Sequence, residues 1–162
     1  LTAAFARLGR VDEGLCLLHE AEAEISRHHG QFYEAELYRL KGTLTLQQHV
    51  NVPSSEFRVE QSPQSKVHSP KSSKTKSPIL NPKSQGEAEA CFLRAIEIAR
   101  RQNAKLFELR ATMSLSRLWQ HQGKRADARS ILAEVYGWFT EGFESVDLKE
   151  ARELLAELGE KP

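Results

Sequence analysis

Apolar residues recur three and four positions apart over most of this chain, which is the spacing of one face of an α-helix. This spacing predicts helices over residues 11–28, 31–48, 87–102, 104–122 and 124–139, preceded by the end of another helix in residues 1–8. Gly9, Gly30 and Gly123 follow three of these segments and fit helix ends. Asp147 and Glu150, three positions apart, predict a capping box that opens a final helix. The sequence therefore predicts an all-α fold.

Small residues recur in these predicted helices at a spacing of about 40 positions. Two series show this spacing: Gly14, Ala88 and Ala128 are separated by 74 and 40 positions, and Thr2, Gly42 and Ser116 by 40 and 74. The longer separation exceeds the shorter by 34, so one extra segment interrupts both series between Gly42 and Ala88. Small side chains let two helix backbones approach closely. The spacing therefore predicts three helix hairpins in which these residues touch, the middle hairpin being split by an insertion.

A second regularity supports the hairpins. A large apolar residue stands four positions after each member of the first series, and a smaller one stands seven positions after it: Leu18, Phe92 and Leu132, then Ala21, Ala95 and Val135. Both offsets place a side chain on the same helix face as the small residue. We expect a stack of antiparallel hairpins of about 40 residues each, an α-solenoid in which each hairpin contacts its neighbours.

Residues 49–85 differ in composition from the rest of the chain. They hold nine Ser, five Pro and six Lys or Arg against two Glu, and they show no helical spacing. Such a segment buries too little apolar surface to offset the entropy cost of ordering it. We expect a disordered insertion here. Its positive charge would suit nucleic acid, but Phe57 is its one aromatic residue, so it lacks the stacking rings of a single-strand binder.

The insertion divides the chain into two helical parts. Residues 1–48 are expected to hold a truncated first repeat and the first helix of the second repeat. Residues 86–162 are expected to hold the second helix of that repeat, the third repeat and a C-terminal capping helix. A polar terminal helix of this kind covers the open edge of a solenoid.

Three segments resemble the C-terminal tetratricopeptide-repeat region of bacterial multidomain signalling proteins: residues 33–44 (YEAELYRLKGTL), 87–129 and 136–155. Such proteins carry a class III adenylate/guanylate cyclase or a winged-helix DNA-binding domain, then a predicted AAA/STAND-type ATPase, then the repeats. The resemblance implies a tetratricopeptide-like α-solenoid whose units run near 40 residues. It also implies a module of a larger protein, in which any cyclase or ATPase activity would lie upstream of Leu1.

Length and composition fit one folded domain. The chain has 162 residues, of which 40% are apolar and 28% charged, and its net charge is +1. No stretch of 18 apolar residues and no signal-peptide pattern occurs. We therefore expect a cytoplasmic protein with no membrane partner.

The expected solenoid indicates where a partner would bind. The first helix of each hairpin lines the concave surface of a solenoid, so its outward residues are candidates for a protein-binding groove. These residues are Glu36, Arg39, Thr43, Gln47, Arg110, Met113, Arg117, Gln120 and His121. Three arginines facing one groove would suit a carboxylate or an acidic peptide, because a guanidinium binds a carboxylate with two hydrogen bonds. The alternative is a solvated charged face that binds nothing.

Four aromatic residues gather near the C-terminus: Tyr136, Trp138, Phe139 and Phe143. Such a group can anchor a partner protein. The interpretation that we favour is packing of the final helix against the last repeat.

No motif predicts chemistry in this chain. It has no GxxxxGK[ST] phosphate-binding loop, no zinc-type ligand spacing and no pattern that implies a reacting centre. We therefore expect no enzyme activity, cofactor, metal or small-molecule substrate in this fragment. The expected function is protein–protein interaction, or regulation of the protein's own upstream domains. A purely structural helical spacer is the alternative, followed by nucleic-acid contact through the insertion.

Overall fold

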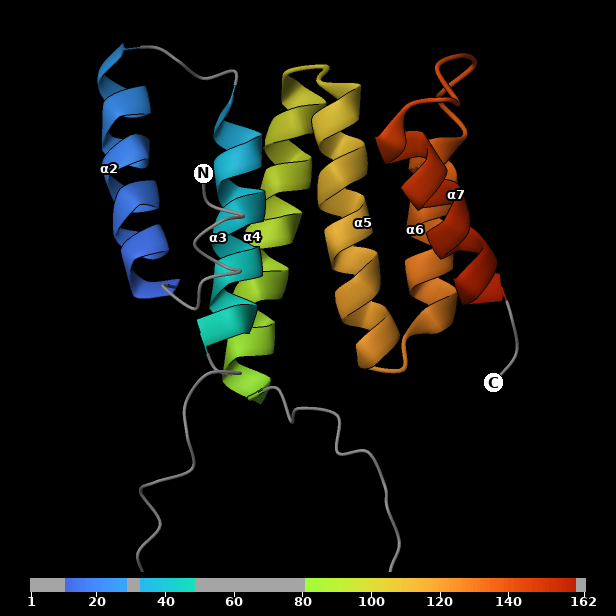
Figure 1. The fold of residues 1–162 in the computed structure, drawn as a ribbon, viewed down its shortest axis with the longest axis horizontal. Coiled ribbons are helices and arrows are strands. Elements are labelled where there is room, and N and C mark those ends of the chain that lie inside the picture. Colours follow the sequence, from blue (N-terminus) through green and yellow to red (C-terminus); the bar gives the residue numbers. More distant parts are fainter. Residues whose placement is uncertain (1–10, 29–32, 49–80, 160–162) are drawn as a thin grey trace, which may run out of the picture.

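The described residues of the chain form helices joined by turns, with no strand. The computed structural model describes residues 11–28, 33–48 and 81–159 (Figure 1). These ranges hold no strand and six helices: α2 (Val11–His28), α3 (Glu34–Gln48), α4 (Pro82–Arg101), α5 (Lys105–His121), α6 (Arg125–Tyr136) and α7 (Val146–Gly159). The all-α prediction is confirmed. The helix expected in residues 1–8 and most of the predicted insertion, residues 49–80, lie outside the described residues.

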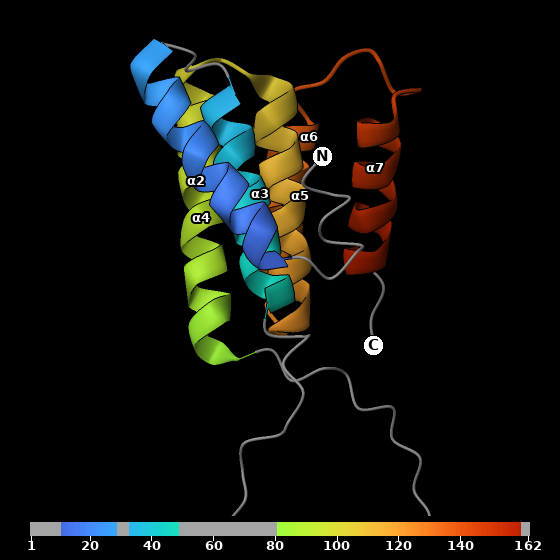
Figure 2. The ribbon, with the colours of Figure 1, turned by 60° about the vertical axis from the view of Figure 1, so that its left-hand side comes forward.

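The helices pack in chain order and alternate in direction (Figure 1). Each helix from α2 to α6 contacts the next one along the chain. In addition α3 contacts α5, and α5 contacts α7, so these three lie in one row, from left to right in Figure 2. None of the described helices combines the length and the apolar character needed to cross a bilayer. The row of α3, α5 and α7 positions the candidate site.

The predicted contacts between small residues close two of the hairpins. A Cβ atom added to Gly42 would lie 3.1 Å from the carbonyl oxygen of Ala88, so α3 and α4 touch there. At the equivalent point of α5 and α6, the hydroxyl of Ser116 donates to the carbonyl oxygen of Ala128 at 3.1 Å. Both predicted contacts are confirmed. In the third pair, Gly14 is buried and Thr2 lies outside the described residues.

The large apolar residues predicted beside these contacts form the core. Leu18, Phe92 and Leu132 are all buried, at 4%, 1% and 0% exposure. One cluster joins α4 to α5, and another joins α5 to α6 and α7. Trp119 of α5 packs against both clusters, so the interior is continuous from α4 to α7.

The insertion ends earlier than its composition predicts. Residues 82–85 were expected to belong to it, but α4 begins at Pro82. Asn81 is the N-cap, and its side-chain oxygen accepts a hydrogen bond from the backbone N–H of Lys83 at 3.0 Å. Proline fits the first position of a helix because that position needs no N–H donor. This Asn-Pro pair outweighs the Ser/Pro-rich composition around it, and Ser84 is 1% exposed.

The last helix also begins at a different cap. The capping box predicted at Asp147 and Glu150 is wrong, because α7 begins at Val146. Ser145 fills the capping role, since its hydroxyl accepts a hydrogen bond from the N–H of Leu148. Asp147 is thereby free to bind elsewhere, and its partner is Arg110 of α5.

The C-terminal aromatic residues divide into two groups. Tyr136 and Phe139 are half-buried against the core cluster of α5, α6 and α7. The ring of Phe143 lies 6.0 Å from that of Tyr136. Trp138 is 62% exposed, with the ammonium of Lys105 at 4.0 Å from its ring centre. The predicted packing role is confirmed for Tyr136 and Phe139 and is wrong for Trp138, while Phe143 is 40% exposed and contacts the ring of Tyr136.

Candidate protein-binding groove

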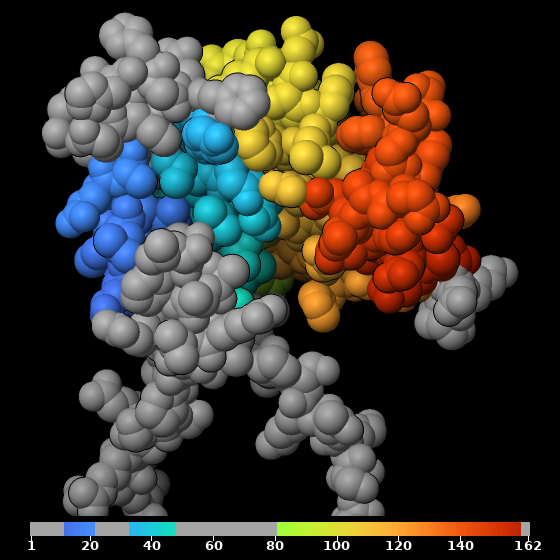
Figure 3. Space-filling model, turned by 45° about the horizontal axis from the view of Figure 1, so that its top comes forward, coloured from blue at the N-terminus to red at the C-terminus, as the bar shows by residue number. Residues whose placement is uncertain are grey.

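Two adjoining pockets lie on the face formed by α3, α5 and α7. The charged pocket has a volume of about 210 Å³ and is lined by Glu36, Arg39, Arg110, Met113, Ser114, Arg117, Asp147 and Glu150. The apolar pocket has a volume of about 330 Å³ and is lined by Arg39, Thr43, Leu46, Gln47, Phe92, Ser114, Arg117, Leu118 and His121. Arg39, Ser114 and Arg117 line both. Figure 3 shows the hollow between α3 and α7, with α5 below it.

Eight of the nine predicted groove residues line these two pockets. Gln120 lines neither of them. Met113 was expected to face outward, but it is 3% exposed and packs in the core cluster beneath α7. The helical period of α3 and α5 therefore placed these residues on one face, while the covering of Met113 by α7 was not predicted.

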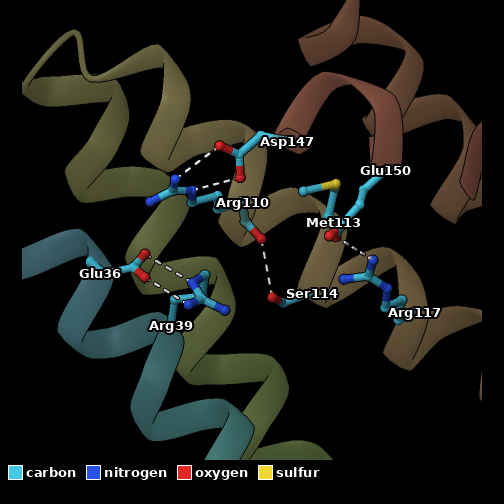
Figure 4. A pocket seen from close by; sticks show the side chains of 8 residues that line it. All are labelled: Glu36, Arg39, Arg110, Met113, Ser114, Arg117, Asp147 and Glu150. Atoms are coloured by element: carbon cyan, nitrogen blue, oxygen red, sulfur yellow. Dashed lines mark hydrogen bonds and ion pairs between the residues drawn. The ribbon is translucent and has the colours of Figure 1, made fainter. Parts of the chain in front are cut away.

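The three arginines are each paired with a carboxylate of this chain (Figure 4). Arg39 donates two hydrogen bonds to Glu36, at 2.9 and 2.7 Å, on the same helix. Arg110 donates two to Asp147, both at 2.8 Å, and so ties α5 to α7. Arg117 donates one to Glu150, at 3.2 Å. The charged pocket is thus balanced in charge, which the sequence did not predict.

The three pairs differ in strength. Two parallel hydrogen bonds hold a guanidinium in one geometry, as at Arg39 and Arg110, and such pairs are stronger than single contacts. The hydrogen bond to Asp147 raises the pKa of Arg110 above its ordinary value. Arg117 and Glu150 are 47% and 49% exposed, and an exposed pair of this kind contributes about 0–1 kcal/mol. Arg117 is therefore the least firmly held of the three.

The apolar pocket has a hydrophobic floor and a basic rim. Leu46, Phe92 and Leu118 supply the apolar side chains. His121 joins two of the arginines at the rim, and no carboxylate stands among the described residues that line this pocket. A cavity of this kind accepts an apolar group. The two arginines at its rim are paired with Glu36 and Glu150 of the adjoining charged pocket.

The ring of Phe92 reaches the floor because Gly42 has no side chain. A Cβ atom at Gly42 would lie 2.7 Å from the ring, closer than side-chain carbons approach. Phe92 comes from α4, behind the row of α3 and α5. The small residue that closes the hairpin therefore also shapes the pocket.

Six of the lining residues were not predicted: Leu46, Phe92, Ser114, Leu118, Asp147 and Glu150. Asp147 and Glu150 were missed because α7 was expected to act only as a cap. Helix α7 contacts α5 as α5 contacts α3, so it lines the pocket as a third helix of the row. A signal was present in the sequence, since Ala156 lies 40 positions after Ser116 and Glu150 lies 40 after Arg110. Extending the repeat by one unit would have identified the helix as part of the groove.

The groove offers charge and shape for binding. No group of three His, Cys, Asp or Glu side chains that could hold a metal ion occurs within residues 11–28, 33–48 and 81–159. The residues that line the two pockets supply guanidinium groups, carboxylates and an apolar floor.

Comparison with known proteins gave no match. No model of a protein family, no curated protein and no solved structure matches the chain. The resemblance of residues 87–129 and 136–155 to a tetratricopeptide-repeat region therefore stays a prediction.

Proposed function

We propose that this chain is a tetratricopeptide-like module that binds a segment of protein in the groove along α3, α5 and α7. The observation that carries the proposal is the junction of the two pockets, where an apolar floor adjoins three arginines. A protein segment can match both surfaces, because it carries apolar side chains for the floor and carboxylates for the arginines. A groove with both surfaces can fix the orientation of such a segment as well as hold it.

The packing of the helices supports this assignment. Contacts run between neighbours along the chain and between alternate helices, α3 with α5 and α5 with α7. Repeat proteins of stacked helix pairs have contacts of this kind, because each pair touches only the next one. The first helices of the pairs then form one continuous surface, which is where both pockets lie.

The resemblance noted above supplies the context for the partner. In that setting the groove would hold or release the protein's own upstream cyclase or ATPase domains, or bind a second protein. The module itself carries out no reaction. Its proposed role is to determine where the bound segment lies.

A purely structural spacer is the second candidate, and one observation favours it. All three arginines of the groove already have a carboxylate partner in the chain. A spacer needs such internal pairing to stay rigid, whereas a binding groove must exchange part of it for its ligand. The two candidates therefore differ in whether any peptide enters the apolar pocket.

Selection of random peptides on a phage library tests the proposal. The target would be the whole chain, and the readout the affinity of the selected peptides for two variants. Thr43→Trp fills the apolar pocket and should weaken binding by about tenfold or more, which is roughly 1.4 kcal/mol. Leu93→Trp is the matched control, because Leu93 is 45% exposed on α4 and lines neither pocket.

Two results would count against the proposed function. Selection could yield no peptide, or it could yield peptides that bind the Thr43→Trp variant as tightly as the unchanged chain. Either result would favour the spacer. Circular dichroism of both variants shows whether the fold is retained.

A further inference from the structure

We propose that Arg117 is an exchangeable anchor: it releases Glu150 and binds a carboxylate of the ligand, whose adjacent apolar side chain enters the apolar pocket. The inference rests on the proposed function and names the chemistry of the partner. That partner is a separate protein segment with an acidic residue next to a large apolar one.

The position of Arg117 supports this role. Its side chain lines both pockets, so it can contact a carboxylate at their junction while a neighbouring group occupies the apolar floor. Its present bond to Glu150 is a single one at 3.2 Å between two groups that are about half exposed. Water and salt weaken such a pair, so a better-placed carboxylate can replace it at small cost.

The other two arginines are less available. Arg39 and Glu36 are about one-fifth exposed and share two hydrogen bonds within one helix. Arg110 is held by two bonds to Asp147, which also join two helices. Breaking either pair would cost two charge-assisted hydrogen bonds, against one at Arg117.

Charge complementarity defines the ligand. The apolar pocket has two arginines and His121 at its rim, and the acidic groups of the site all lie in the charged pocket. Once Glu150 swings away, Arg117 is an unpaired cation next to an apolar cavity of about 330 Å³. An acidic residue beside Leu or Phe satisfies both, whereas a basic peptide would place like charges together.

The exchange of Glu150 for a ligand carboxylate at Arg117 predicts that the loss of an ion pair increases the affinity for the ligand. Glu150 competes with the ligand for Arg117, so removing its charge should tighten binding although an ion pair is lost. If the pair were merely structural, removing either partner would have the same effect on the ligand. The signs of the two variants therefore separate the two roles.

The experiment measures the affinity of the full chain for a labelled dodecapeptide with a central Glu-Phe pair, by fluorescence anisotropy. Glu150→Gln should tighten binding by about two- to fivefold, the equivalent of one exposed ion pair. Arg117→Gln should weaken it by about tenfold or more. Glu153→Gln and Arg101→Gln, exposed and outside both pockets, are the matched controls and should change nothing. A peptide with Gln-Phe in place of Glu-Phe should not respond to Glu150→Gln.

The outcomes distinguish the inference from the proposed function. If Thr43→Trp blocks the peptide but Glu150→Gln weakens binding or leaves it unchanged, the exchange is wrong and the groove still binds. If Thr43→Trp has no effect, or no peptide binds, both proposals fail. The chain's own residues Glu56 and Phe57 also pair an acid with an apolar group. If deletion of residues 53–62 tightens binding as Glu150→Gln does, that segment of the chain is the occupant of the groove, and the inference that the partner is a separate protein is wrong.

Discussion

The hydroxyl of Ser116 donates a hydrogen bond to the carbonyl oxygen of Ala128 at 3.1 Å, and this contact repeats one that Gly42 makes 74 residues earlier. At Gly42 the backbone of α3 lies so close to Ala88 that an added Cβ would be 3.1 Å from its carbonyl oxygen. Two neighbouring hairpins, α3 with α4 and α5 with α6, thus close in the same way, although a long insertion splits the first of them.

The close approach at Gly42 predicts that a methyl group there is destabilising. In Gly42→Ala the new Cβ meets the ring of Phe92 at 2.7 Å, and that ring is buried. Overpacking of about 1–3 kcal/mol should exceed the gain of about 1 kcal/mol in helix propensity. We expect a net loss of about 1 kcal/mol in the free energy of unfolding, measured with urea.

Gly86 provides the matched control for this substitution. It lies in α4 with nothing within 4 Å of its added Cβ. Gly86→Ala should therefore stabilise the protein by up to about 1 kcal/mol through helix propensity alone. Equal effects of the two substitutions would contradict the close contact at Gly42.

The ion pairs of Glu108 predict that removing the buried carboxylate costs less stability than removing its two partly exposed cations. This side chain is 2% exposed and contacts Arg100 at 2.7 Å and Lys105 at 2.9 Å. The two cations are 48% and 34% exposed, so they regain water when Glu108 is replaced. Glu108→Gln should cost about 1–2 kcal/mol, whereas Arg100→Met with Lys105→Met strands a buried charge and should cost about 3 kcal/mol or more.

Chemical denaturation of both variants measures this difference. If Arg100→Met with Lys105→Met lowers the free energy of unfolding no more than Glu108→Gln does, the carboxylate of Glu108 is hydrated in the double variant and the predicted asymmetry is wrong. Either single cation replacement should fall between the two, because one partner remains to neutralise the charge.

The pair of Arg110 and Asp147 predicts how α7 is held. Its two hydrogen bonds join α5 to α7, and Asp147→Asn should cost about 1 kcal/mol. The loss should fall on α7. In the Asp147→Asn variant the backbone amides of α7 should therefore exchange with deuterium faster than in the unchanged protein, while those of α4 should exchange at the same rate. Glu153→Gln, exposed on the same helix, should leave this exchange unchanged.

The same pair has a defined dependence on pH. The bond to Asp147 raises the pKa of Arg110, so the contribution of the guanidinium is complete below the ordinary arginine pKa. It is lost only as the pH rises through the raised value. Near neutral pH, Arg110 should therefore add no slope to a plot of stability against pH.

The N-cap of α4 predicts a local effect at the end of the insertion. Asn81→Ala removes the acceptor for the N–H of Lys83 and should cost about 1 kcal/mol. Asn81→Asp keeps the acceptor and should be nearly neutral or stabilising, because a negative charge suits the start of a helix. Faster exchange of the Lys83 amide in the alanine variant alone would support the cap.

The sequence was sufficient to predict the packing that depends on side-chain size. Gly42 and Ala88 were expected to touch because only small residues let two helices approach closely, and they do. The face that carries Arg39 and Arg117 followed from the helical period in the same way. These features are set by one helix or one hairpin, so the local pattern determines them.

What the sequence did not predict depends on distant contacts or on a single cap. Asp147 meets Arg110 only because α7 packs beside α5, and no local pattern specifies that placement. The start of α4 was missed because a Ser/Pro-rich stretch hid the pair of Asn81 and Pro82. A cap of one residue changes a helix boundary without changing the average composition around it.

The ring of Phe92 has a consequence for the energetics of recognition. It is 1% exposed, and it is held against the backbone of Gly42 before any ligand arrives. The floor of the apolar pocket is therefore preorganised, so a ligand loses little affinity to the ordering of that side chain. Most of the entropy cost of binding should then be borne by the incoming segment.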